Sequence, residues 1–220
     1  MCNIVRKRWD LFRGTNPAEL YACQIQDPAC VEDWVQSPDA RDPFKPEANW
    51  CAMCCTQMIL RAEGVSPPPL LELFEQAISF SVYRQEEARI GWRGAYHREL
   101  ADYLGTKWRM RSSAERNMSP EWVCRMLSYG NYCLLSVHPE IRLRADIPPP
   151  HKNGHFVLIY GYNTTEEGEI YFLLQNTAGF ASQESQVGMA ISAHRLEQVF
   201  SGNGIVVQSR FAHLSMLRAA

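Results

Sequence analysis

Hydrophobic residues in the first part of the chain recur at the spacing of amphipathic helices. The strongest such segment is "CAMCCTQMILRAEG", which follows Asn49, a residue type common at helix N-caps, and closes at Gly64. A second helix is expected to begin at Ser66 with prolines in its first turn, and a third over about 95–104, ended by Gly105. Further helices are predicted over about 119–129 and 192–201.

The pattern changes in the second half to apolar runs that are too short for helices and rich in β-forming residues. "YCLLSVHP" and "GIVVQSRF" each predict one strand. "HFVLIYGYN" and "EIYFLLQN" are separated by the turn-like "NTTEEG" and predict a hairpin. Helices come first and strands follow, so the fold class expected is α+β with an antiparallel sheet.

The length of the chain and the change in its local composition indicate its domain organisation. The chain has 220 residues, of which 46% are hydrophobic, which is enough for one globular core. Residues 1–48 are rich in proline and turn formers and predict an irregular N-terminal extension with short helices near 17–25 and 29–36. Residues 49–220 then form a single domain.

Charge and targeting signals narrow the partners and the compartment. The net charge of −2 gives no general reason to expect binding to nucleic acid or to a membrane. No apolar run approaches the roughly 20 residues of a membrane span, and the N-terminus lacks signal-peptide features. We therefore expect a cytoplasmic protein with reduced cysteines. Two basic clusters are expected to be solvated faces: Arg6, Lys7, Arg8 and Arg13, and Lys107, Arg109, Arg111 and Arg116.

Three cysteines at the start of the first predicted helix raise the question of chemistry. A cysteine nucleophile needs help to form its thiolate, since the pKa of a free thiol is about 8.5. Cys51 falls in the first helical turn, where the helix dipole favours a thiolate, whereas Cys54 and Cys55 lie deeper and are expected to pack inside. A metal site that adds His151 and His155 is the alternative, but the spacing fits no common zinc motif, so no metal is expected.

The predicted hairpin supplies the partners that a cysteine nucleophile requires. His155 opens one strand and Asn176 closes the other. A turn centred between Thr165 and Glu166 would place the two directly opposite, with Cβ atoms about 5 Å apart. Asn176 would then accept a hydrogen bond from one imidazole nitrogen and leave the other for the thiol. Cys51, His155 and Asn176 are therefore the candidate catalytic residues.

These motifs resemble those of papain-like cysteine peptidases, in particular the branch of bacteriocin-processing (double-glycine leader) peptidases and papain-like bacterial effectors. "WCAMCCTQMIL" is similar to the nucleophile motif, "NGHFVLIYGYN" to the strand that carries the base, and "LLQNTAG" to the segment of the third residue. The resemblance covers residues 49–180. It implies a papain-like fold, with a helical half that carries the Cys and a sheet half that carries His and Asn.

The sequence departs from this family upstream of the nucleophile. The family has a glutamine five or six residues before the Cys that donates to the oxyanion, but positions 45 and 46 are Lys and Pro here. Asn49 is the candidate substitute. Loss of one oxyanion donor typically costs about 10²–10³ in rate, so weak proteolysis is expected if no substitute acts.

The resemblance implies a cysteine peptidase that hydrolyses a peptide bond through a thioester and needs no cofactor. Its partners would be a protein or peptide substrate and, for an effector toxin delivered without a signal peptide, an immunity or inhibitor protein. A processing peptidase is the other setting. Two alternatives stay open: a transferase, transglutaminase or deamidase that uses the same residues, and a binding module that has lost catalysis.

Overall fold

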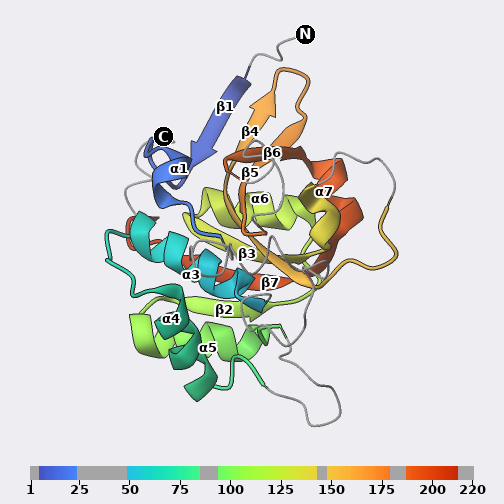
Figure 1. Cartoon of the computed structure of the whole chain (residues 1–220). Coiled ribbons are helices and arrows are strands. Elements are labelled where there is room, and N and C mark those ends of the chain that lie inside the picture. The colour runs from blue at the N-terminus through green and yellow to red at the C-terminus, as the bar shows by residue number, and fades with distance from the viewer. Residues whose placement is uncertain (1–4, 24–48, 85–93, 143–147, 179–186, 213–220) are drawn as a thin grey trace, which may run out of the picture.

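The centre of the molecule is an antiparallel sheet. The computed structural model describes residues 5–23, 49–84, 94–142, 148–178 and 187–212 (Figure 1). Within these residues the sheet has seven strands in the order β2-β7-β3-β4-β5-β6, and β1 pairs with β4 outside that path. The strands are β1 (Val5–Asp10), β2 (Ser112–Glu115), β3 (Asn131–Val137), β4 (His155–Thr165), β5 (Ile170–Asn176), β6 (Met189–Ser192) and β7 (Phe200–Gln208).

Helices pack around this sheet in two groups. Figure 1 shows α4 and α5 at the bottom of the view, α3 above them across the middle left, α6 near the centre and α7 at the upper right. This arrangement confirms the expected α+β class. None of the described helices is long and apolar enough to cross a membrane. The helices are α1 (Pro17–Leu20), α3 (Cys51–Ala62), α4 (Leu70–Ser79), α5 (His97–Trp108), α6 (Pro120–Ser128), α7 (Ala193–Val199) and the 3₁₀ helix η2 (Pro139–Arg142).

The core lies where α3 crosses the middle of the sheet. Every residue of α3 except Arg61 is buried, which explains why this helix is apolar on nearly all sides. Strands β3, β4 and β5 are buried on both faces over most of their length, so they appear in the sequence as continuous apolar runs. The position of Cys51 at the end of α3 is therefore set by the most deeply buried helix of the protein.

The N-terminal segment is more ordered than the sequence suggested. The expectation of an irregular region is wrong for residues 5–10, because β1 pairs with the second half of β4. The short helix expected near 17–25 is present as α1, which packs near α3. Arg61 of α3 donates to the carbonyl oxygens of Leu20 and Tyr21 at 3.2 and 2.6 Å. Residues 5–23 are thus part of the same fold as the helices and sheet. The helix expected near 29–36 lies outside the described residues.

Two predicted helix boundaries were wrong. Helix α4 begins at Leu70, after the three prolines and not at Ser66. A residue that precedes a proline is restricted to extended conformations, so the helix cannot start before Pro69. Helix α5 continues through Gly105 to Trp108 and ends at Arg109, which adopts a left-handed conformation with φ 54°.

The hairpin of β4 and β5 forms as predicted, but its register differs. Asn176 pairs with Val157, and His155 pairs with Val137 of β3, so the expected direct pairing of His155 with Asn176 is wrong. The turn is centred at Glu167 and not between Thr165 and Glu166, since Thr164 pairs with Ile170, and a register shift between Ile159 and Gly161 then moves the pairing by one residue. A sequence pattern contains neither of these local irregularities.

Gly161 allows β1 to approach this irregular part of β4. A Cβ atom at Gly161 would collide with the backbone carbonyl of Trp9 in β1. We therefore expect Gly161→Ala to lower the free energy of unfolding by about 2 kcal/mol or more. Denaturant unfolding measures this loss. Gly94→Ala is the control, since a Cβ there meets nothing within 4 Å. Equal stability of the two variants would contradict the close packing of β1 on β4.

Candidate active site

Cys51 is the first residue of α3, and Trp50 occupies the N-cap position without a side-chain capping bond. Asn49, expected to cap the helix, lies one residue earlier, so this detail of the prediction was wrong. The thiol of Cys51 donates a long hydrogen bond of 3.9 Å to the backbone carbonyl of Asn49. Among the described residues, the side-chain amide of Asn49 has no hydrogen-bond partner, so this amide remains available to another acceptor.

His155 and Asn176 form a buried hydrogen-bonded pair. The distance from His155 Nε2 to Asn176 Oδ1 is 2.8 Å. The two residues are diagonal neighbours across β4 and β5, and the long imidazole side chain spans that separation. The structure therefore brings together two of the three predicted catalytic residues, by a different register from the one expected.

The backbone fixes the tautomer of this pair. Asn176 Oδ1 also accepts a hydrogen bond from the backbone N–H of Ala178 at 3.2 Å, which identifies the atom as the oxygen. An oxygen accepts only, so His155 Nε2 must carry the proton in this bond. In the neutral ring, Nδ1 is then the nitrogen that carries the lone pair, which is what a general base needs.

Cys51 lies against the start of β4, next to His155. The backbone N–H of Phe156, the residue that follows His155, is close enough to the thiol to lower its pKa. Burial has the larger and opposite effect and raises the pKa of Cys51 to about 11. The helix N-terminus does help the thiolate, through the N–H groups of Cys51 and Ala52, but burial outweighs that help. At neutral pH the free thiol is therefore protonated.

Cys54 and Cys55 are completely buried, as expected for the deeper positions of α3. Burial raises the pKa of each thiol well above its ordinary value. Such thiols are inert toward solvent reagents. Within the described residues, no three His, Cys, Asp or Glu side chains gather closely enough to hold a metal ion. Cys51 differs from its neighbours because it touches the strand that carries His155.

Tyr21 is a residue near the site for which no sequence pattern provides a signal. Its hydroxyl donates to the backbone carbonyl of Asn176 at 2.8 Å. Burial is the main cause of the strongly raised pKa of this hydroxyl, and Cys23 adds to it. The N-terminal segment thereby contacts the residue that orients His155. Tyr21 and Asn176 are far apart in the chain, and no motif links them.

His97 is a second histidine near the start of β4. Its ring centroid lies 5.0 Å from that of Phe156. Burial, and secondarily the charge of Arg116, lowers the pKa of His97, so its ring is neutral at physiological pH. Among the described residues its Nε2 is buried without a hydrogen-bond partner. We regard His97 as part of the packing behind Phe156.

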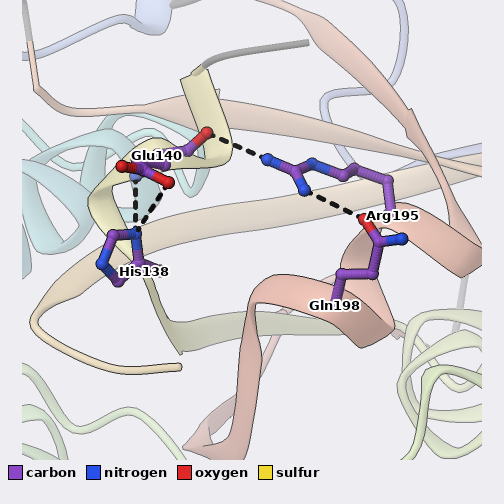
Figure 2. Close-up of polar contacts among 4 residues, drawn as sticks. All are labelled: His138, Glu140, Arg195 and Gln198. Atoms are coloured by element: carbon purple, nitrogen blue, oxygen red, sulfur yellow. Dashed lines mark hydrogen bonds and ion pairs between the residues drawn. The ribbon is translucent and has the colours of Figure 1, made fainter. Parts of the chain in front are cut away.

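His138 belongs to a separate polar cluster that supports the end of β3 (Figure 2). Its Nδ1 accepts from the backbone N–H of Glu140 at 3.1 Å and lies 3.9 Å from the carboxylate of that residue. Arg195 of α7 donates to the carbonyl of Glu140 at 3.2 Å and to the side chain of Gln198 at 3.0 Å. These contacts tie η2 to α7 and indicate a structural role for His138.

Comparisons with known proteins add little to this geometry. No protein-family model matches the chain, and no curated protein matches it. The chain is similar to a crystal structure of a Bacillus anthracis protein described as a C39-like peptidase. The TM-score is 0.49 at 12% identity, and the match covers 74% of this chain and 90% of that one. At this level the likeness has no weight in assigning function, which must rest on the residues described above.

Proposed function

We propose that this protein is a cysteine peptidase in which Cys51 is the nucleophile, His155 the general base and Asn176 the residue that orients the base. The observation that supports this most directly is the hydrogen bond of 2.8 Å between His155 and Asn176. This bond occupies Nε2, so Nδ1 is the ring nitrogen that would accept a proton, and the thiol of Cys51 contacts Phe156, the residue that follows His155. The three sequence motifs independently resemble those of papain-like peptidases.

The raised pKa of Cys51 determines the order of events in this proposal. The thiol is neutral at rest, so Nδ1 of His155 takes the proton as Sγ forms its bond to the substrate carbonyl carbon. The imidazolium then gives that proton to the amine, which leaves as the C–N bond breaks. Water attacks the thioester with His155 again as base, and this releases the acid and restores the thiol.

An oxyanion forms in both steps and needs donors. The backbone N–H of Cys51 lies at the N-terminal end of α3, where helix N–H groups have no partner within the helix. The unpartnered amide of Asn49, next to the turn that leads into Cys51, is our candidate for the second donor. Asn49 would then take the place of the glutamine that the resembling family has upstream.

The proposal is tested with a peptide library made from a whole-proteome digest, incubated with the full chain and with Cys51→Ser. New peptide N-termini that appear with the wild type alone would support peptide-bond hydrolysis and would reveal the cleavage rule. Ammonia release without new termini would identify a deamidase or transglutaminase on the same residues. A wild type that matches Cys51→Ser in both assays would leave a binding module.

The biological setting is a further part of this proposal. A bacterial effector toxin that cleaves a protein of a target cell, with an immunity protein as its inhibitor, is suggested by the resemblance alone. Inducible expression of the wild type beside Cys51→Ser in a bacterial cytoplasm tests it. Growth arrest with the wild type only would favour a toxin, and equal growth would favour a processing peptidase.

A further inference from the structure

A basic hollow lies at the other end of α3 from Cys51. It has a volume of about 380 Å³ and is lined by Arg109, Arg111 and Arg210 together with Gln208 and Ser209. The 12 residues of α3 separate this hollow from the candidate nucleophile. At 1.5 Å per residue this is roughly 18 Å, too far for one side chain to serve both places.

The fold brings these arginines together from distant parts of the chain. Arg109 ends α5, and its left-handed conformation with φ 54° turns the chain toward β2. Gln208 donates its backbone N–H to the carbonyl of Arg111 at 2.8 Å, which holds the end of β7 beside this turn. Arg210 is held through its backbone N–H by Glu63 at 2.8 Å and through its guanidinium by the carbonyl of Trp108 at 3.0 Å.

The guanidinium groups of the hollow form no ion pairs with the acidic side chains that the structure describes. In the described part of the chain, no carboxylate lies within ion-pair distance of the guanidinium of Arg109, Arg111 or Arg210. Glu63 lies beneath, but Oε1 already accepts from Tyr132 and Ser209, and Oε2 accepts from the backbone of Arg210. The guanidinium groups therefore remain available to a ligand.

A second hollow of about 350 Å³ adjoins the first and shares Arg111 and Gln208. Its other lining residues include Ser113 and Asn131. The hydroxyl of Ser113 donates to Glu115 at 2.6 Å, and the amide of Asn131 donates one hydrogen to the carbonyl of Met126 at 2.9 Å, which leaves its second hydrogen for a ligand. Among the described residues, the combined lining presents fixed positive charge and includes no acidic side chain, and Glu115 contacts it only through Ser113.

We propose that the hollow formed by Arg109, Arg111 and Arg210 is a binding site for a multiply charged oxyanion, either a phosphate group or a cluster of carboxylates. The guanidinium fork matches both groups through paired N–H···O bonds, and arginine stays charged at all physiological pH values. This inference does not depend on the peptidase proposal, because it uses none of the residues of that site.

The test is isothermal titration of the full chain with sodium pyrophosphate and, separately, with citrate, at about 50 mM NaCl, where surface charge is only partly screened. We expect saturable binding that is roughly tenfold weaker in Arg111→Gln and in Arg109→Gln. Arg125→Gln is the matched control, since Arg125 is an exposed arginine on α6, away from the hollow. Both site arginines are exposed, so the variants should fold, and thermal melts check this.

The outcomes separate the ligand sources. Binding of pyrophosphate alone assigns a phosphate site, binding of citrate alone assigns a carboxylate site, and binding of both assigns a general oxyanion site. If neither pyrophosphate nor citrate shows saturable binding, the proposal is overturned. Equal weakening in Arg125→Gln would also overturn it, because the binding would then reflect only the overall charge of the surface.

Discussion

We expect His155→Ala to lose at least about 10⁴-fold in the rate of hydrolysis of any peptide that the wild type cleaves, as in other enzymes whose nucleophile depends on a histidine base. The physical reason is that burial raises the pKa of Cys51 to about 11, so the thiol is protonated without a base to accept its proton. The measurement is kcat/KM on one cleaved peptide.

The control for this loss is a histidine of structural role. His138→Asn removes an imidazole that contacts Glu140 and leaves His155 and Asn176 unchanged. This variant should keep kcat/KM within about tenfold of the wild type. If His155→Ala and His138→Asn lose activity equally, the loss reflects general damage to the fold, and the assignment of His155 as base fails.

The largest expected effect on stability is at Glu63. This buried carboxylate accepts hydrogen bonds from Tyr132 at 3.0 Å, from Ser209 at 2.7 Å and from the backbone of Arg210 at 2.8 Å. It joins the end of α3 to β3 and to the segment after β7. Glu63→Leu would leave three donors without an acceptor, so we expect a loss of about 3 kcal/mol or more in the free energy of unfolding.

Glu63→Gln is the matched variant, because it keeps the shape and one acceptor oxygen. Its loss should be smaller, about 1–2 kcal/mol. Urea unfolding followed by circular dichroism gives both values. A loss in Glu63→Leu no greater than that in Glu63→Gln would show that these hydrogen bonds contribute little to stability.

The sequence was most informative where burial is continuous. The apolar runs of β3, β4 and β5 and the apolar helix α3 were identified because each is buried over most of its length. Helix α6 was also placed closely, since Ser119 caps it and its side chain accepts from the N–H of Trp122. These elements include those that carry the candidate catalytic residues.

The polar edge of the sheet could not be predicted. Strand β2 has the sequence "SSAE" and forms because it pairs with β7, and β1 has the sequence "VRKRWD" and pairs with β4. Neither carries an alternating apolar pattern, so tertiary pairing overrides local preference. Arg109 and Arg111 adjoin β2. Because the pairing of β2 with β7 could not be predicted, the proximity of these two arginines to Arg210 could not be predicted either.

The predicted contact between His155 and Asn176 is present, but its geometry differs from the one expected. His155 and Asn176 do form a hydrogen bond, but through diagonal contact, because the turn between β4 and β5 lies further along the chain than predicted. The sequence also predicted that the N-terminus of α3 would favour the thiolate of Cys51, but it did not predict that burial would outweigh this effect. The sequence reveals the helix dipole, whereas the burial that opposes it depends on the packing of the whole fold.

The most direct test of the account is the rate of alkylation of Cys51 by iodoacetamide near pH 7, in the wild type and in His155→Ala, with the labelled residue identified by mass spectrometry. Burial shifts the pKa of Cys51 from 9.0 to about 11. Each pKa unit lowers the thiolate fraction tenfold, so Cys51 in His155→Ala should react about 100-fold more slowly than an ordinary cysteine. In the wild type, His155 can accept the proton of the thiol, so the rate should be at least about tenfold higher than in His155→Ala. Equal rates in the two proteins would contradict a Cys51–His155 pair and with it the proposed catalysis.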